Sequence, residues 1–155
     1  MIRRAESKDI DAILDLLLQV LMVHHNGRPD LFKPDCTKYN HEELEEIIKD
    51  DSRPIFVFDD DENGVVGYAF CVHQEHPDDN VLTPIKTLYI DDICISENFR
   101  GHGVGKSILD YVKTFAKENG YYNITLNVWE CNPSADAFYR SQGLIPYKTG
   151  MEMIL

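Results

Sequence analysis

The sequence lacks a C-x-x-C pair and any apolar run approaching the roughly 20 residues of a membrane-spanning helix. The N-terminus carries charged residues with no following apolar region or cleavage site, so we expect no secretory signal. Three of the four cysteines stand among apolar or aromatic neighbours, which is typical of free thiols in a reducing compartment. These absences favour a cytoplasmic protein without disulfides.

Positive charge is also scarce. The chain has 15 Lys and Arg against 27 Asp and Glu, and its formal net charge is -12. An acidic surface is repelled by phosphate backbones and by anionic lipid, so we expect no nucleic acid and no membrane as partners. The same charge attracts a small cationic substrate, although acidity can also serve solubility alone.

A linker between domains is missing as well. No repeat, low-complexity tract or Ser/Gly stretch divides the 155 residues, so residues 1–155 form one expected domain. Apolar patterns predict strands over residues 2–5, 54–58, 65–73, 86–95 and 123–128, and one or two more within 144–155. Four helices are expected. The first runs from an N-cap at Ser7 to about His24, and the second starts at a capping box formed by Asn40 and Glu43. The third follows the glycine-rich turn and ends at Gly120, and the fourth runs from Asn132-Pro133 to Gly143.

The order of these elements indicates an α/β fold. The strand–turn–helix–strand unit between Leu88 and Val128 makes part of the sheet parallel, and the hairpin around residues 59–64 is antiparallel. We therefore expect a mixed, partly parallel central sheet of six to seven strands with helices on both faces.

A glycine-rich turn, Arg100-Gly101-His102-Gly103-Val104-Gly105-Lys106-Ser107, follows a strand and opens a helix. Glycines allow close approach of a ligand to the backbone, and the helix N-terminus adds positive potential, so the turn predicts a phosphate site. The P-loop pattern fails because Arg100 stands at its first glycine, and the dinucleotide pattern fails because Lys106 stands at its third. The pattern [RQ]-x-x-G-x-[GA] fits without exception.

That pattern resembles the acyl-CoA pyrophosphate loop of the GNAT superfamily of N-acetyltransferases. Tyr89–Ile95 is similar to the strand that pairs with the pantetheine arm. The segment from Asn132 to Leu144 is similar to the family's N-x-x-A-x-x-F/Y-Y-x-x-x-G-F segment, with Leu144 where Phe is usual. The resemblance implies a GNAT-like sheet and an acetyltransferase that takes its acetyl group from acetyl-CoA, without a metal. The pair His73 and His76 has no matching cluster that would suggest one.

The resemblance also implies how acetyl-CoA is held. Arg100 fixes the loop, and the pyrophosphate is bound by N–H groups of Gly101, His102, Gly103, Val104, Gly105 and Lys106. Lys106 either assists with its side chain or is only a solvated first-turn lysine. The pantetheine amides pair with Ile93, Cys94 and Ile95. Asn132 contacts the CoA arm or only caps its helix, and Ala135 leaves room for the thioester.

Two residues are candidates for the chemistry. By resemblance, Tyr139 donates a proton to the leaving thiolate; otherwise it is a core aromatic with its hydroxyl in solvent. Asp91 is the candidate general base, directly or through water. Alternatively Asp91 and Asp92 bind a cationic substrate or cap backbone groups. Counting by twos puts Asp91 on the face of Tyr89 and Ile93, and Asp92 on that of Ile90 and Cys94, unless a bulge intervenes.

The acceptor is expected to be a primary amine that attacks acetyl-CoA directly in a ternary complex. Asp91-Asp92 resembles the Glu-Asp pair of the polyamine N-acetyltransferases, which favours a small cationic amine. Glu130 is expected at the mouth of the site, and Phe32 lies in the segment that covers the acceptor in the superfamily, or in an ordinary loop. The alternatives are a protein N-terminal or lysine acetyltransferase and a non-catalytic acyl-CoA-binding module. The family's habits also suggest a homodimer.

Overall fold

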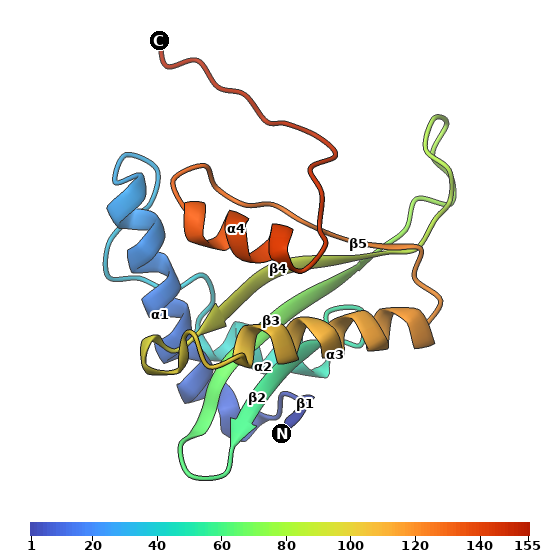
Figure 1. Cartoon of the computed structure of the whole chain (residues 1–155). Helices are drawn as coiled ribbons and strands as arrows, with labels where there is room; N and C mark the ends of the chain where they lie inside the picture. Colours follow the sequence, from blue (N-terminus) through green and yellow to red (C-terminus); the bar gives the residue numbers. More distant parts are fainter.

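Five strands form a single mixed sheet in the computed structural model, which describes all residues from Met1 to Leu155 (Figure 1). The strands are β1 Ile2–Arg4, β2 Ile55–Asp60, β3 Gly64–Gln74, β4 Thr87–Ile95 and β5 Asn123–Leu126, and they lie side by side in that order. The first four pair antiparallel, and β5 runs parallel to β4. The helices are α1 Ile10–Gly27, α2 His41–Lys49, α3 Val104–Glu118 and α4 Pro133–Ser141.

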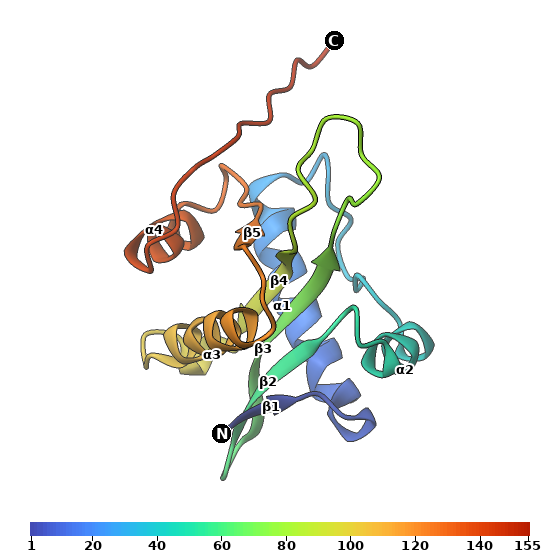
Figure 2. The same cartoon turned by 90° about the vertical axis from the view of Figure 1, so that its right-hand side faces the viewer.

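Helices cover both faces of this sheet, as predicted (Figure 2). Alternate residues of β3 divide between two cores because successive side chains of a strand point to opposite faces. Tyr68 and Phe70 are buried with α1 and α2 on one face. Ala69 and Cys71 are buried with α3 on the other face, where α4 also lies. None of the helices combines the length and apolar character needed to cross a membrane.

The prediction of six to seven strands is wrong. Residues 144–155 form neither strand nor helix, and the last backbone hydrogen bond of the chain runs from the Leu144 N–H to the Tyr139 carbonyl. A strand exists only where a neighbouring strand supplies hydrogen bonds, and nothing in the chain pairs with this segment. It leaves the domain as an extended tail (Figure 1).

Of two predicted helix N-caps, the structure confirms one and contradicts the other. The capping box is confirmed: Asn40 Oδ1 accepts from the Glu43 N–H at 2.9 Å, and Glu43 accepts from the Asn40 N–H at 2.8 Å. The Ser7 N-cap is wrong. Its hydroxyl donates to Glu45 at 3.0 Å, and a 3-10 turn over Ser7–Asp9 precedes α1.

Candidate active site

The glycine-rich turn connects β4 to α3 and leaves a row of backbone donors free. No N–H group from residue 101 to residue 106 has an acceptor within the chain; the first to find one is that of Ser107, which donates to the Gly103 carbonyl at 3.0 Å. Gly101 and Gly103 have φ angles of 79° and 82°, a conformation that favours glycine. A Cβ at either position would meet no atom within 4 Å. The loop thus presents open space and free donors together, which is the chemistry of an anion site.

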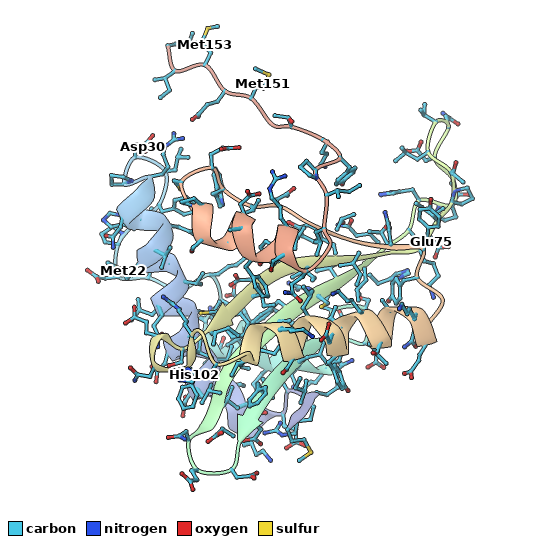
Figure 3. All side chains as sticks on the ribbon, in the orientation of Figure 1. Met22, Asp30, Glu75, His102, Met151 and Met153 are labelled. Atoms are coloured by element: carbon cyan, nitrogen blue, oxygen red, sulfur yellow. The ribbon has the colours of Figure 1, made fainter.

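Arg100 and Gly105 hold this loop in place. The Arg100 Nε donates to the Ile95 carbonyl at 3.0 Å and ties the loop to the end of β4. A Cβ on Gly105 would lie 3.3 Å from the Phe138 ring, so α4 packs closely against the start of α3. Lys106 pairs with Asp110 at 2.5 Å on the helix surface. His102 stands at the exposed rim, where its ring contacts the Arg100 carbonyl at 3.0 Å (Figure 3).

A β-bulge at Asp91 reverses the side-chain order of β4. In the register with β3, Phe70 opposes Asp92 and Cys71 opposes Ile90, so Asp91 has no partner. Ile90 and Ile93 consequently both pack on the α3 face, and Cys94 on the α1 face. The period-two assignment, which put Ile90 with Cys94 and Asp91 with Ile93, applied only to a strand without a bulge. The bulge is present, and an inserted residue shifts every later side chain to the other face.

β4 and β5 separate at the same place. Their pairing ends at Ile90 and Leu126, so no strand lies beside the β5-facing edge of β4 from residue 91 to residue 95. This edge carries Ile93, Cys94 and Ile95, and an exposed strand edge is a template for an extended ligand that carries amides. The free edge leads directly to the free donors of the glycine-rich turn.

Asp91 is engaged by residues from the segment between α1 and α2. Its Oδ2 accepts from Lys38 Nζ at 2.6 Å and from the Tyr39 hydroxyl at 3.1 Å, and Arg53 in turn donates to that hydroxyl at 3.1 Å. The Asp91 side chain is only 20% exposed, whereas Lys38 is 45% exposed. One carboxylate of the pair is therefore already neutralised by a lysine that itself reaches solvent.

Asp92 has a different environment. Its Oδ2 accepts from the Tyr68 hydroxyl at 2.7 Å, and burial raises the pKa of this carboxyl, although the Tyr68 hydrogen bond opposes the shift. Burial likewise raises the pKa of Tyr68, and the Asp92 charge adds to that shift. A carboxylate with a raised pKa is a stronger base near neutral pH than an ordinary aspartate.

Tyr139 lies on α4 near this pair. Burial raises its pKa, and the negative charge of Asp92 raises it further, so the phenol stays protonated at neutral pH. Its hydroxyl has no hydrogen-bond partner in the chain, and no buried side-chain oxygen or nitrogen lacks one, so this hydroxyl reaches solvent. Asn132 caps α4 through the Ala135 N–H at 3.3 Å, which fixes the start of the helix.

An aromatic cluster joins the predicted acceptor segment to the start of α4. Phe32 packs on His24 and on Trp129, with ring centroids 5.1 Å apart in both cases. Burial lowers the pKa of His24, and the Lys38 charge lowers it further. Glu130 is exposed next to Trp129. The structure thus brings Phe32 beside the β5–α4 connection.

Four residues of this site carry no signal in the amino-acid sequence. Lys38, Tyr39, Tyr68 and Trp129 form no motif. The pairing of β3 with β4 brings Tyr68 to Asp92, whereas Lys38 and Tyr39 reach Asp91 from the segment between α1 and α2. Cys94 is no nucleophile here, because burial raises the pKa of its thiol to about 12 while it donates to the Leu16 carbonyl at 3.4 Å. No group of three or more His, Cys, Asp or Glu side chains is arranged to hold a metal ion.

Comparison with known proteins identifies the family. Residues 20–144 match the model of the acetyltransferase (GNAT) family. The crystal structure of a tetramutant of the BH1408 protein from Bacillus halodurans superposes with a TM-score of 0.95 at 28% identity, over 100% of this chain and 99% of that one.

Two more distant structures share the fold alone. One is an aminoglycoside acetyltransferase from an uncultured soil metagenomic sample, in complex with sisomicin, with a TM-score of 0.72 at 17% identity over 100% of this chain and 94% of that one. The other is a Trypanosoma brucei acetyltransferase, with a TM-score of 0.71 at 21% identity over 100% and 99%. Since the family model spans most of its length, the chain belongs to the acetyltransferase (GNAT) family and is an acetyl-CoA-dependent N-acetyltransferase.

Proposed function

We propose that this enzyme acetylates a primary amine of a small cationic substrate, by direct attack of the amine in a ternary complex. The observation that carries the proposal is the hydrogen bond of Asp92 to Tyr68 beside the point where β4 and β5 separate, with the Asp92 charge raising the pKa of the Tyr139 phenol on α4. The free edge of β4 would hold the thioester here, and Asp91 and Asp92 would hold the amine, so the two reactants can meet.

The residues present fit acetyl-CoA. The free N–H groups of residues 101–106 and the positive end of α3 suit its pyrophosphate, and the open edge at Ile93, Cys94 and Ile95 suits its pantetheine amides. Bound there, acetyl-CoA supplies the acyl carbon and a thiolate leaving group. We assign Arg100 to positioning the loop, and Asn132 and Ala135 to the wall on the α4 side.

The incoming ammonium has to lose a proton before it attacks, and Asp92, with its raised pKa, takes that proton directly or through water. When the carbon–sulfur bond breaks, Tyr139 donates its proton to the sulfur, which its free and protonated hydroxyl permits. The base role predicted for Asp91 remains a prediction, but its contact with Lys38 favours a role in substrate binding instead.

The cationic acceptor is supported by the ion pair at Asp91. Lys38 is itself a primary ammonium, and it stands 2.6 Å from Asp91 on a segment between two helices. A substrate ammonium has the same chemistry and can replace it, because the Lys38 side chain is 45% exposed. The net charge of -12 and the exposed Glu130 favour the same class of acceptor.

The test is thiol release from acetyl-CoA by the purified protein with polyamines, aminoglycosides, amino acids and short peptides, with Tyr139→Phe as the control. We expect release with polyamines or aminoglycosides, and much less from the variant. Release with peptides alone would assign the enzyme to protein N-termini or lysines. Tight CoA binding without release from any amine would make the chain a non-catalytic acyl-CoA-binding module.

A further inference from the structure

Tyr68 is completely buried, and it neither gives nor takes a proton in the proposed reaction. Its ring packs edge-on against Phe70, with the ring centroids 4.9 Å apart, in the core that α1 and α2 cover. Its hydroxyl nevertheless meets a carboxylate, because Oδ2 of Asp92 accepts from it at 2.7 Å. A buried hydroxyl needs a hydrogen-bond partner, but here the partner is the carboxylate proposed as the general base.

The β-bulge at Asp91 places Asp92 on the same face of the sheet as Tyr68. Phe70 opposes Asp92 across β3 and β4, and Tyr68 opposes Cys94. Opposed residues share a face, and so do residues two apart in one strand, so Asp92 and Tyr68 both lie on the side of α1 (Figure 2). Core packing fixes the Tyr68 ring, so its hydroxyl offers Asp92 a donor at one fixed point.

The two carboxylate oxygens of Asp92 differ. Tyr68 holds Oδ2, whereas Oδ1 accepts no hydrogen bond from the chain. No buried side-chain oxygen of the protein lacks a partner, so Oδ1 reaches solvent. Burial raises the pKa of Tyr68 well above its ordinary value, so the phenol keeps its proton and donates it to a hydrogen bond with the ionised carboxylate. One oxygen of Asp92 is therefore fixed, and the other is free for the acceptor amine.

Other ionisable groups face Asp92 from the elements around it. They are Asp91 and Cys94 of β4, Tyr139 of α4, and Lys38 of the segment between α1 and α2. The Lys38 charge lowers the pKa of Asp92 and the Asp91 charge raises it, but neither residue forms a hydrogen bond with Asp92. Tyr68 is the only side chain of the protein that does.

We propose that Tyr68 is a positioning residue for the general base: its hydroxyl holds Oδ2 of Asp92 and leaves Oδ1 turned to the acceptor ammonium. This inference rests on the proposed base role of Asp92. The ammonium gives one proton to Oδ1, directly or through water, and the amine attacks with the electron pair that this frees. Asp92 then returns the proton to water, and no proton leaves Tyr68. Because the hydrogen bond stabilises the ionised carboxylate, Tyr68 also sets the lowest pH at which the base works.

The first test is the pH dependence of kcat/KM in Tyr68→Phe. The variant keeps the ring and removes only the donor, so the midpoint of the acidic limb should rise by about one pH unit. Below the midpoint kcat/KM should fall about tenfold, and well above it most of the rate should return. A residue that serves folding alone would lower the rate equally at every pH. An unmoved midpoint overturns the proposal.

Tyr39→Phe is the matched control. It removes a hydroxyl that donates to the neighbouring carboxylate of Asp91 at 3.1 Å, so it can change KM but should not move the midpoint. An equal shift in both variants would show a general change of charge in the site and would also overturn the proposal. Ionisation of the acceptor amine affects every variant alike and cancels in the comparison.

The second test follows the contact without catalysis and without Tyr68→Phe. In protein labelled with 13C at the Cζ atoms of tyrosine, the Tyr68 resonance should titrate with the midpoint of kcat/KM, and in Asp92→Asn it should not. A Tyr68 resonance that does not respond to Asp92 overturns the proposal even if Tyr68→Phe fails to fold. If the resonance responds but the rise of kcat/KM with pH survives in Asp92→Asn, Asp92 is not the base. The proposed function then fails at that step, and the role of Tyr68 fails with it.

Discussion

The two halves of the active site are built on opposite principles. The half assigned to acetyl-CoA is a continuous piece of chain in which polar groups are left without partners, from the edge of β4 through the N–H groups of residues 101–106. The acceptor half is assembled from distant pieces in which polar groups are satisfied: Asp91 by Lys38 and Tyr39, and Asp92 by Tyr68. The first half gains its partners when a ligand binds, whereas the second has partners already.

This difference has a consequence for specificity. Backbone N–H groups recognise a ligand by its shape and charge, and their positions change little when a side chain is substituted. The CoA half should therefore tolerate substitutions at positions other than its glycines. The acceptor half depends on side chains, and each of its ion pairs can be exchanged for a contact with a substrate. The acceptor should therefore be the feature of this enzyme that substitutions alter most readily.

The largest expected effect is that of Gly103→Glu. The change adds bulk and a negative charge in front of the free N–H groups, so it should weaken CoA binding by about 100-fold or more. The fluorescence of Trp129, the single tryptophan of the chain, offers a binding signal. Gly120→Glu is the matched control, because Gly120 also has a positive φ, of 73°, and open space around it, but lies after the other end of α3. Equal binding by the two variants would refute the loop assignment.

The next effect concerns the chemical step. Tyr139→Phe removes a hydroxyl without a partner in the chain, so the fold and CoA binding should be kept while kcat falls by about 100-fold or more. Steady-state kinetics measures the fall, and binding titration gives the control. If kcat is unchanged, Tyr139 is only a packed aromatic residue.

The third prediction concerns the two carboxylates. Burial raises the pKa of Asp92 above its ordinary value of 3.8, so kcat/KM should rise with pH through this higher pKa as the base ionises. Asp92→Asn should abolish that rise and lower the rate at neutral pH by about 100-fold. Asp91→Asn should keep it. If instead the rise disappears in Asp91→Asn and survives in Asp92→Asn, the original prediction for Asp91 is correct.

The same pKa predicts an opposite effect on stability. The raised pKa means that the folded protein favours protonated Asp92, so its contribution to stability is present at low pH and is lost as the pH rises through the raised value. Asp92→Asn should therefore raise Tm more at pH 8 than at pH 5. Thermal denaturation at the two pH values measures this. A Tm that drops equally at both would mean that the carboxylate stabilises the fold.

Sequence reasoning succeeded where the signal is local. The loop from Arg100 to Lys106 and the capping box at Asn40 and Glu43 are consecutive patterns whose geometry follows from the residues themselves. At Asp91 it left two side-chain orders open, because a bulge is set by pairing with β3 and has no residue signature. It could not find Lys38 or Tyr68, which lie 53 and 24 positions from the carboxylates they contact. The strands expected within residues 144–155 were wrong because a strand needs a hydrogen-bonding neighbour, and the chain supplies none for this segment.

The smallest expected effect is on KM, and it tests whether the acceptor half exchanges its own contacts for contacts with the substrate. Lys38→Met removes the internal ammonium while keeping a side chain of similar length, and Asp91 then retains only the Tyr39 hydroxyl. If a substrate ammonium competes with Lys38, KM for a cationic amine should fall by about two- to fivefold with little change in kcat, the range expected of an ion pair with an exposed partner. Lys33→Met, on the same segment but in none of the ion pairs, is the control and should leave KM unchanged. If KM rises in Lys38→Met, the lysine contacts the substrate directly, and an acceptor that carries a carboxylate beside its amine would then fit the site better than a polyamine.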